Sequence, residues 1–587
     1  MTKYRQEEAY RIRVAAADMA KDRIHPNHNG NGDEQRYATA NYAMCFTKGL
    51  RHNASNGLII DKEDFERFRS AIDDGFIDAF TTRVRASSDK DRPWEAPTAG
   101  IAYDLEGPDP QAVTMAPAPA LGSDELAYEM AEVYELALLR DEPLTAFVDG
   151  STNAAVNAAV NRLDALDYAA NGLPGRPRAT EGGNVTAQTL FRGSSKKVAI
   201  GPYLSQFMLI GTDQPGNPGV AHGFVQYGAL QINQRVPVAT QQNYMTALPD
   251  WLDAQNGVKL RNNATLFEAA TPGEAAPRRF ITFPRDLATY VHDDALYESY
   301  LNACLILLSM EAPFDPAFSN LSGQGSLFLN SLDINGNFLA GLESHARQAG
   351  GFALYGGPHI LTLVTEVATR ALKAVRYQKY NTHIRLRPEA LAARVEKAAA
   401  IETDFPQIGT PFSDLAASIA PTVGEIRAIN SSGTALLPMA FQEGSPMHPS
   451  YGAGHAAVAG ACVTILKAFF DTTTVFVRRG NKDLFAQHQA NDVAVQYAPD
   501  ATGANLVAST GGDFLTLEGE LNKLAANISI ARNMAGVHYY SDYYDSLRMG
   551  EEIALGILEE QALCYPTDPF VLTVPTFDGD VVRIGAR

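Results

Sequence analysis

The sequence predicts a mainly α-helical globular fold with little β structure, and three observations lead to this prediction. Seven stretches carry apolar residues three and four positions apart, the spacing that gives a helix one buried face. The segments between them are rich in Pro and Gly, as long irregular connections are. The sequence contains neither a repeat of fixed period nor a low-complexity tract, which excludes solenoids and fibrous proteins.

The predicted elements follow one another along the whole chain. Helices are expected over residues 61–85, 124–140, 152–166, 287–310, 358–383, 455–470 and 518–553, and long Pro- and Gly-rich connections over 91–122, 171–184 and 212–223. A Pro-containing run ends just before the fourth helix and marks a boundary. We therefore expect an N-terminal helical region, 1–285, for packing or assembly, and a C-terminal helical region, 286–587, that carries the chemical motifs. One continuous domain is the alternative.

The composition narrows the classes of protein and of partner. With 45% hydrophobic residues among 587, the chain can bury a large core, and its net charge of −19 repels nucleic acid. The apolar windows at 303–310 and 455–470 are shorter than the roughly 20 residues of a membrane-spanning helix. Residues 1–23 lack the apolar core of a secretory signal, so we expect a soluble protein, cytoplasmic by default.

The four cysteines are Cys45, Cys304, Cys462 and Cys564, and they are widely spaced. They form no C-x-x-C pair, so the sequence indicates neither a zinc site nor a disulfide framework. Buried apolar thiols are the favoured interpretation, and bridges between subunits remain open.

The first candidate motif lies at the end of the helix 358–383. Lys379, His383 and Arg387 follow one another at steps of four, which would stack three basic side chains along one helix stripe. Pro388 favours an extended conformation for Arg387, so the helix should end before this residue and leave the guanidinium free to bind an oxyanion. A solvated basic helix end is the alternative interpretation.

The second candidate motif runs from His448 to His455. Gly454 and His455 begin an apolar helix, and exposed backbone N–H groups at a helix N-terminus bind anions. The two histidines add groups that exchange protons near neutral pH. The alternative is a Gly-containing turn in which Ser450 or His455 caps the helix.

The third candidate motif contains Arg532, His538 and Asp542. His538 and Asp542 stand at i and i+4, on one side of a predicted helix, where the carboxylate can fix the imidazole tautomer. Arg532 lies roughly 120° away in an ideal helix, and a bend at Gly536 would bring it to the same place. An ordinary surface His–Asp pair is the alternative.

The three motifs follow one another along the chain as Lys-x7-Arg-Pro, then Gly-His at a helix start, then Arg-x5-His-x3-Asp. In this order they resemble the three-part signature of vanadium-dependent haloperoxidases. The likeness is greatest to the red-algal and cyanobacterial bromoperoxidase branch and is clear from about Asn302 onward. It implies two four-helix bundles in the catalytic core, with vanadate as the cofactor. The N-terminal half shares only a general character with the family.

The resemblance also implies a role for each residue of the three motifs. Lys379, Arg387 and Arg532 would hold the equatorial vanadate oxygens, the Gly454 N–H would add a further donor, and His538 would be the axial vanadium ligand. His455 would be the acid–base residue, Lys379 would polarise bound peroxide, and Asp542 would orient His538. His448 is similar to an extra histidine of bromide-selective members.

One position departs from the family pattern. Ala453 stands where the family commonly has Ser before Gly-His, so a hydroxyl contact to vanadate or peroxide is absent. This leaves the halide preference open, with bromide expected first, iodide as an alternative and chloride as the poorest substrate.

The implied partners are hydrogen peroxide, a halide and small organic acceptors that the hypohalous product halogenates. A homo-oligomer built from dimers, up to a dodecamer, is implied as well. Some relatives hold structural calcium, for which this sequence offers no assigned ligands. The run 333–337 resembles part of a calcium loop, but the later acidic ligand is misplaced, so a Gly-containing turn is favoured.

Two other functions are compatible with these residues. A soluble acid phosphatase would use the same oxyanion site, with His538 as nucleophile and His455 as general acid. The eight-residue step from Lys379 to Arg387 and the presence of His448 argue against it. A non-enzymatic helical assembly protein is the second alternative, suggested by the motif-poor N-terminal half.

Overall fold

The computed structural model describes residues 2–214, 216–260, 267, 276–316, 352–565 and 571–585. The fold is mainly helical, as predicted. The α-helices are α1 Thr2–Asp22, α2 Asp33–Arg36, α3 Lys62–Asp74, α4 Ile77–Thr82, α5 Asp124–Leu138, α6 Ala154–Asp164, α7 Asp167–Ala170, α8 Leu248–Gln255, α9 Pro284–Tyr290, α10 Glu298–Ser309, α13 Phe352–Tyr355, α14 Gly357–Tyr377, α15 Pro388–Glu396, α16 Ala398–Asp404, α17 Pro411–Ser418, α18 Ala420–Ile429, α19 Gly454–Phe469, α20 Leu517–Met534 and α21 Tyr540–Ala562. A π-helical turn, η7 Gln378–His383, continues α14.

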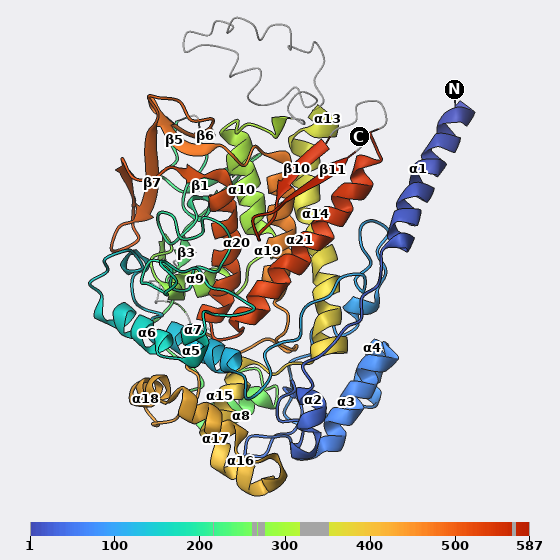
Figure 1. Ribbon diagram of the computed structural model, residues 1–587, viewed down its shortest axis with the longest axis vertical. Helices are drawn as coiled ribbons and strands as arrows, with labels where there is room; N and C mark the ends of the chain where they lie inside the picture. Colours follow the sequence, from blue (N-terminus) through green and yellow to red (C-terminus); the bar gives the residue numbers. More distant parts are fainter. Residues whose placement is uncertain are drawn as a thin grey trace, which may run out of the picture.

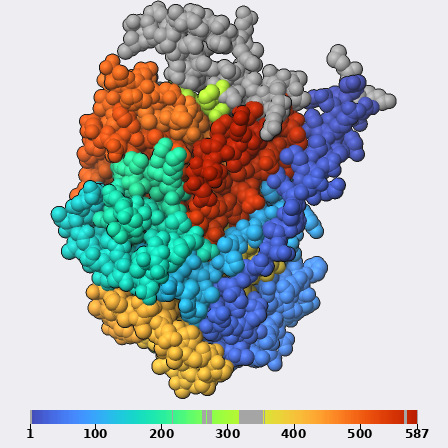
Figure 2. All heavy atoms as spheres, in the orientation of Figure 1, coloured from blue at the N-terminus to red at the C-terminus, as the bar shows by residue number. Residues whose placement is uncertain are grey.

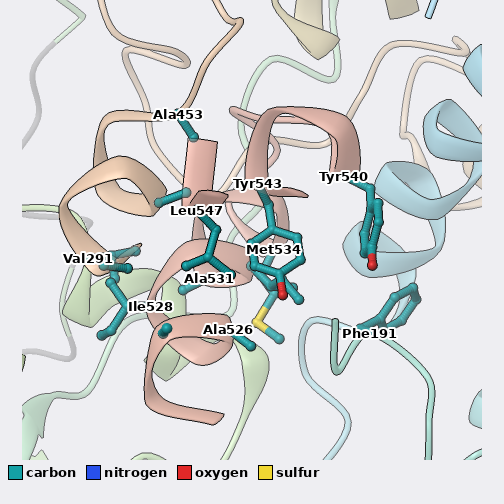
Figure 3. Packing of buried hydrophobic residues seen from close by; sticks show 14 of the residues in the cluster. Phe191, Val291, Ala453, Ala526, Ile528, Ala531, Met534, Tyr540, Tyr543 and Leu547 are labelled. Atoms are coloured by element: carbon teal, nitrogen blue, oxygen red, sulfur yellow. The ribbon is translucent and has the colours of Figure 1, made fainter. Parts of the chain in front are cut away.

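Helices α10, α14, α19, α20 and α21 form a central bundle (Figure 1). Every residue of α19 from Ala456 to Phe469 is buried, which explains its nearly unbroken apolar sequence. Helices α19 and α21 approach closely, because a Cβ added at Gly460 or at Gly550 would lie only 1.9 Å from a backbone oxygen of the other helix. Side chains of α20 and α21 pack against each other, with Ala453 at the edge of this layer (Figure 3).

The strands form small antiparallel sheets. They are β1 Phe224–Tyr227, β2 Leu230–Asn233, β3 Val236–Pro237, β4 Arg278–Arg279, β5 Val475–Arg479, β6 Lys482–Ala486, β7 Val493–Pro499, β8 Leu506–Thr510, β9 Leu515–Thr516, β10 Val571–Pro575 and β11 Val581–Gly585. The largest sheet has the order β6-β5-β7-β8, with β9 beside β5, and it lies between α19 and α20 along the chain. Hairpin β10–β11 packs on α19 and α21.

The segments before residue 286 wrap around this bundle. Helix α5 packs on α20 and α21, and the main hydrophobic core contains residues from both sides of the predicted boundary, from Tyr37 to Ile584. Helices α3 and α15–α17 lie at the lower end of the molecule in Figure 1. Helix α1 extends from the body as an arm (Figure 2).

Three predicted helices are interrupted, which corrects their predicted extents. The first ends at Gly75, whose φ of 70° stops α3, and the chain restarts as α4. The helix predicted over 287–310 is instead α9 and α10, separated by seven irregular residues. The one predicted over 518–553 is α20 and α21, separated at Gly536, whose φ is 86°. Glycine adopts such left-handed conformations without steric cost, so it ends helices readily.

Several smaller expectations can be compared with the structure. Cys45, Cys304 and Cys462 are buried free thiols, as favoured, whereas Cys564 is exposed. The run 333–337 lies outside the described residues. Among the residues that the structure describes, none of the helices is long and apolar enough to cross a membrane.

Candidate active site

The predicted site residues meet at one end of the bundle. Four helix ends come together there, at the lower end of the bundle in Figure 1. They are the C-terminal ends of α14 and α20 and the N-terminal ends of α19 and α21. The ends of these helices and the segments next to them carry the three sequence motifs. Motifs separated by more than 60 residues in sequence therefore face one another.

Lys379 lies on the π-helical turn and is fully buried. Its Nζ donates to the backbone oxygens of Pro449 and Ser450 at 2.8 and 2.9 Å. Burial, and after it the charge of Arg387, lowers the pKa of Lys379 well below its usual value. An anion beside Lys379 would offset this cost.

Arg387 leaves the helix stripe that the sequence predicted, because Ile384 adopts a left-handed φ of 40° and ends the turn. Arg387 becomes the N-cap residue of α15, which confirms that the helix ends before it. Its guanidinium donates to the oxygens of His448 and Val537 at 2.9 and 2.8 Å. Burial lowers the pKa of Arg387 to about 9.

His383 does not join Lys379 and Arg387. Its ring packs edge-on against Tyr451, and its Nε2 lies 3.2 Å from Oε1 of Gln378. Burial lowers the pKa of His383 to about 3, so this histidine is a neutral packing residue.

His538 and Asp542 contact each other, but not as a pair on one helix face. His538 precedes α21, and Asp542, in its first turn, also accepts from the backbone N–H of Tyr539. The Nδ1 of His538 lies 2.7 Å from Oδ2 of Asp542, so Nδ1 carries the proton, and the lone pair of Nε2 accepts from Nη1 of Arg387 at 3.0 Å. Burial, then Arg387, lowers the pKa of His538 well below its usual value. A neutral imidazole with an unprotonated Nε2 is a suitable metal ligand.

A buried network holds Asp542 in place. Ser450 donates its hydroxyl to Oδ2 of Asp542 at 2.5 Å, and Arg385 donates to Oδ1 at 3.1 Å. Arg385 also pairs with Glu129 of α5, an element of the N-terminal half. The orientation of His538 thus depends on residues far away in sequence.

Gly454 is the first residue of α19, so its backbone N–H lies at the positive end of the helix dipole. The adjacent His455 places its Nε2 2.9 and 3.1 Å from the two oxygens of Asp294. Burial lowers the pKa of His455, while Asp294 acts in the opposite direction. The backbone N–H of Ala453 donates to Oγ of Ser546 at 2.8 Å, and the side chain of Ala453 itself carries no hydroxyl.

Arg532 lies in the last turn of α20, and the bend at Gly536 brings it to the same site as His538, as the sequence suggested. Its Nη1 donates to the oxygen of Val291 at 2.5 Å. Its Nε is buried without a hydrogen-bond partner among the described residues. Burial lowers the pKa of Arg532.

His448 connects Arg387 with the surface. Its Nδ1 lies 2.8 Å from Nη2 of Arg387, and its Nε2 lies 2.9 Å from Oε2 of Glu95. Burial, with Arg376 as the next cause, lowers the pKa of His448 well below its usual value.

The arrangement fits an oxyanion. Lys379, Arg387 and Arg532 are buried cations, and none of them forms an ion pair with a carboxylate in the described part of the chain. Isolated buried charges are costly unless they are paired, and the unsatisfied Nε of Arg532 adds a free donor. A tetrahedral oxyanion next to Nε2 of His538 would satisfy these groups.

Sequence reasoning missed three supporting residues. Asp294 was placed inside a continuous helix, and nothing in its neighbourhood marks it as the partner of His455. Arg385 precedes Arg387 by two residues, so the Arg-x-Arg spacing was a usable signal. Glu95 lies in a Pro-rich loop that carries no motif.

Comparison with known proteins identifies the family. A family model described as the second helical-bundle domain of VCPO matches residues 430–562. The vanadium-dependent bromoperoxidases of Corallina pilulifera and Corallina officinalis are 39% and 40% identical to this chain, over 99% of it and 98% of their own length. The chain belongs to the vanadium-dependent bromoperoxidases.

A solved vanadium-dependent bromoperoxidase confirms the fold. The second vanadate-dependent bromoperoxidase of Ascophyllum nodosum, described as homohexameric, superposes with a TM-score of 0.75 at 24% identity, covering 99% of this chain and 90% of that one. A curated vanadium-dependent bromoperoxidase of Ascophyllum nodosum is 29% identical over 99% of this chain. The bromoperoxidase assignment made from the three motifs is therefore confirmed, and these relatives give no support to the acid phosphatase alternative.

Proposed function

We propose that this bromoperoxidase binds vanadate in the pocket between Lys379, Arg387, Arg532 and His538 and uses hydrogen peroxide to oxidise bromide. The observation that carries the proposal is a group of three buried cations around the unprotonated Nε2 of His538, none of which has a carboxylate partner among the described residues. Such a pocket selects a compact anion with several oxygens.

Lys379, Arg387, Arg532 and the backbone N–H of Gly454 would hold the oxygens of vanadate, and Nε2 of His538 would bind the vanadium. When bound, vanadate supplies a Lewis acid that activates peroxide toward a halide without a change in oxidation state. Asp542 keeps the proton on Nδ1 of His538, so Nε2 stays unprotonated.

His455 would move the protons of the reaction. Its ring is held against Asp294, which fixes the orientation of the imidazole at the start of α19. A histidine fixed in this way can take a proton from incoming peroxide and return it to the leaving oxygen. Lys379 would add positive charge next to the peroxide oxygen that bromide attacks.

The experiment is vanadate reconstitution. Purified protein is incubated with orthovanadate, freed of excess, and assayed for peroxide-dependent bromination of a diketone reporter, with chloride and iodide in parallel. We expect bromination that requires vanadate and falls at least about tenfold in Lys379→Met, since one charge-assisted contact contributes about 1.5–3 kcal/mol. Hydrolysis of a phosphate ester without any halogenation would overturn the proposal.

We further propose that the chain is a homo-oligomer, because its structural neighbour is described as homohexameric. Light scattering coupled to size-exclusion chromatography should give a multiple of the 63.4 kDa chain mass. The same measurement shows whether the assembly contains an even number of chains, as one built from dimers would, and whether it reaches a dodecamer.

Small electron-rich organic molecules remain the proposed acceptors. Structural calcium also remains a proposal, and the described residues contain no cluster of three His, Cys, Asp or Glu side chains that could hold a metal ion.

A further inference from the structure

The irregular segment 291–294, between α9 and α10, contacts two residues of the proposed site. The backbone oxygen of Val291 accepts the one side-chain hydrogen bond that Arg532 makes among the described residues, at 2.5 Å. Three positions later, the carboxylate of Asp294 lies 2.9 and 3.1 Å from Nε2 of His455. A shift of this segment would therefore displace a proposed vanadate donor and the proposed acid–base residue together.

His292 lies between these two contacts and attaches the segment to the turn 441–444. Its Nε2 lies 2.7 Å from Oε1 of Glu443, and its ring stacks on that of Phe441, with 3.8 Å between the centroids and 6° between the planes. Burial raises the pKa of Glu443, but the contacts with His292 are the largest opposing effects, and the pKa stays below its usual value. An ionised carboxylate can only accept, so Nε2 of His292 carries the proton and donates.

The turn 441–444 gives this contact a fixed base. The backbone oxygen of Glu443 accepts from Nζ of Lys48 at 3.1 Å. Just before the turn, Ala440 donates its N–H to the oxygen of Ala535 at 3.2 Å, immediately after α20. The turn is therefore attached both to the N-terminal region and to the C-terminal end of α20.

We propose that His292 and Glu443 are positioning residues that anchor the segment 291–294. Through this segment they orient Arg532 and His455 for the reaction, without touching vanadate or peroxide themselves. The inference rests on the proposed function, which assigns vanadate binding to Arg532 and proton transfer to His455. The alternative is an ion pair without effect on the site, since the side chain of His292 is 18% exposed and that of Glu443 is 26% exposed.

The test separates the hydrogen bond of Glu443 from its charge. Glu443→Ala removes both, whereas Glu443→Gln removes the charge and keeps an oxygen that can accept from His292. Asp293→Ala is the matched control, because Asp293 is an exposed carboxylate of the same segment whose charge, like that of Glu443, acts on Arg532.

We expect Glu443→Ala to weaken vanadate binding by about fivefold and to lower kcat at saturating vanadate by a similar factor, since a partly exposed ionic contact is modest. Glu443→Gln should keep most of both values, and Asp293→Ala should stay within about twofold of the wild type. If Glu443→Gln and Asp293→Ala instead lose as much as Glu443→Ala, the effect is one of charge and the anchor is refuted.

His292→Phe examines the other half of the contact. It keeps a ring that can stack on Phe441 but loses the N–H donor, so its effects should match those of Glu443→Ala. The double variant should be no worse than either single one, because both substitutions remove the same hydrogen bond. Losses that add in full would contradict a shared role.

Hydrogen exchange on vanadate-free protein tests the anchor independently of the proposed function. Mass spectrometry follows the backbone amides of residues 291–298, and we expect exchange at least about fivefold faster in Glu443→Ala but unchanged in Glu443→Gln and Asp293→Ala. Unchanged exchange in Glu443→Ala would rule out the anchor, and faster exchange with wild-type vanadate affinity and kcat would rule out its effect on the site. A wild type that neither binds vanadate nor brominates would sink the proposed function, while the exchange result would still decide whether His292 and Glu443 anchor the segment.

Discussion

Arg532 is a buried cation with little compensation from the protein. Among the described residues it makes one side-chain hydrogen bond, to the oxygen of Val291, and its Nε has no partner. A charge of this kind is expected to be retained for a ligand rather than for stability, because replacing a buried charge by an apolar side chain is often neutral or stabilising. Measurements of stability and of vanadate binding can distinguish a ligand-binding role of Arg532 from a structural one.

We predict that Arg532→Met leaves the melting temperature of vanadate-free protein unchanged or raises it. Added vanadate should raise the melting temperature of the wild type by mass action, and this rise should shrink in the variant. Loss of charge-assisted contacts of about 1.5–3 kcal/mol corresponds to about 10- to 100-fold weaker vanadate binding. Differential scanning fluorimetry over a vanadate series checks both parts. A variant that melts earlier without vanadate, yet keeps the full rise, would assign Arg532 a structural role.

Asp294 contacts the ring of His455 and opposes the effect of burial on its protonation. Burial lowers the pKa of His455, and the carboxylate of Asp294 partly opposes this shift. In Asp294→Asn the opposing charge is lost, so the pKa of His455 falls further and the ring loses its proton at a lower pH. The limb of the kcat against pH profile that reports His455 should therefore move to lower pH. An unchanged profile, or a shift to higher pH, would show that His455 does not carry out the rate-limiting proton transfer.

At the scale of elements, the site depends on how closely α19 and α21 pack. Gly460 faces the backbone of Leu547, and Gly550 faces that of Ala457, so the two helices meet without side chains between them. Helix α19 begins with the Gly454 N–H and His455, and His538 immediately precedes α21. A change in their separation would therefore move the proposed axial ligand relative to the donors on the opposite side.

We predict that Gly460→Ala lowers both stability and vanadate affinity. The added methyl group would lie 1.9 Å from a backbone oxygen, so the helices must separate, and overpacking of this kind costs about 1–3 kcal/mol. Gly424→Ala on α18 is the matched control, because its added Cβ meets no atom within 4 Å and alanine favours a helix interior by about 0.5–1 kcal/mol. Thermal unfolding and vanadate titration of both variants test this. Equal effects of the two substitutions would rule out the close contact as the cause.

The same elements show what the sequence could and could not predict. Apolar periodicity predicted α5, α14 and α19 to within a few residues, because each buries a continuous face or its whole surface. The interruption between α9 and α10 was not predicted, since the residues around Asp294 continue a helical pattern and only their contact with His455 distinguishes them. Glu95 could not be predicted either, because its importance comes from a contact across 353 positions of sequence. The sheet β5–β9 was also not anticipated beyond the expectation of little β structure.

At the scale of the whole molecule, the N-terminal and C-terminal regions are connected through buried polar contacts. Lys48 pairs with Glu389 at 2.7 Å, both side chains being nearly inaccessible to solvent. Glu129 of α5 pairs with Arg385, which in turn holds Asp542. Breaking a buried pair leaves an uncompensated charge, so neither region can unfold without cost to the other.

We propose on this basis that residues 1–285 and 286–587 unfold as one cooperative unit. The two tryptophans, Trp94 and Trp251, both belong to the N-terminal region, whereas the proposed vanadate contacts all belong to the C-terminal region. Trp251 also packs on Ala393 and Leu436 of the C-terminal region, whereas Trp94 packs on Phe68 and Phe80. In a Trp251→Phe protein the remaining tryptophan fluorescence therefore reports on the N-terminal region while vanadate stabilises the other. If the regions are coupled, vanadate will raise the temperature of the fluorescence transition by as much as it raises that of the calorimetric transition. Two separate transitions, with only the non-fluorescent one sensitive to vanadate, would instead support independent domains divided near residue 285.

In the coupled case, changes at the interface between the regions should also weaken vanadate binding. Lys48→Met, which breaks the buried pair with Glu389, is the variant in which to look for that effect.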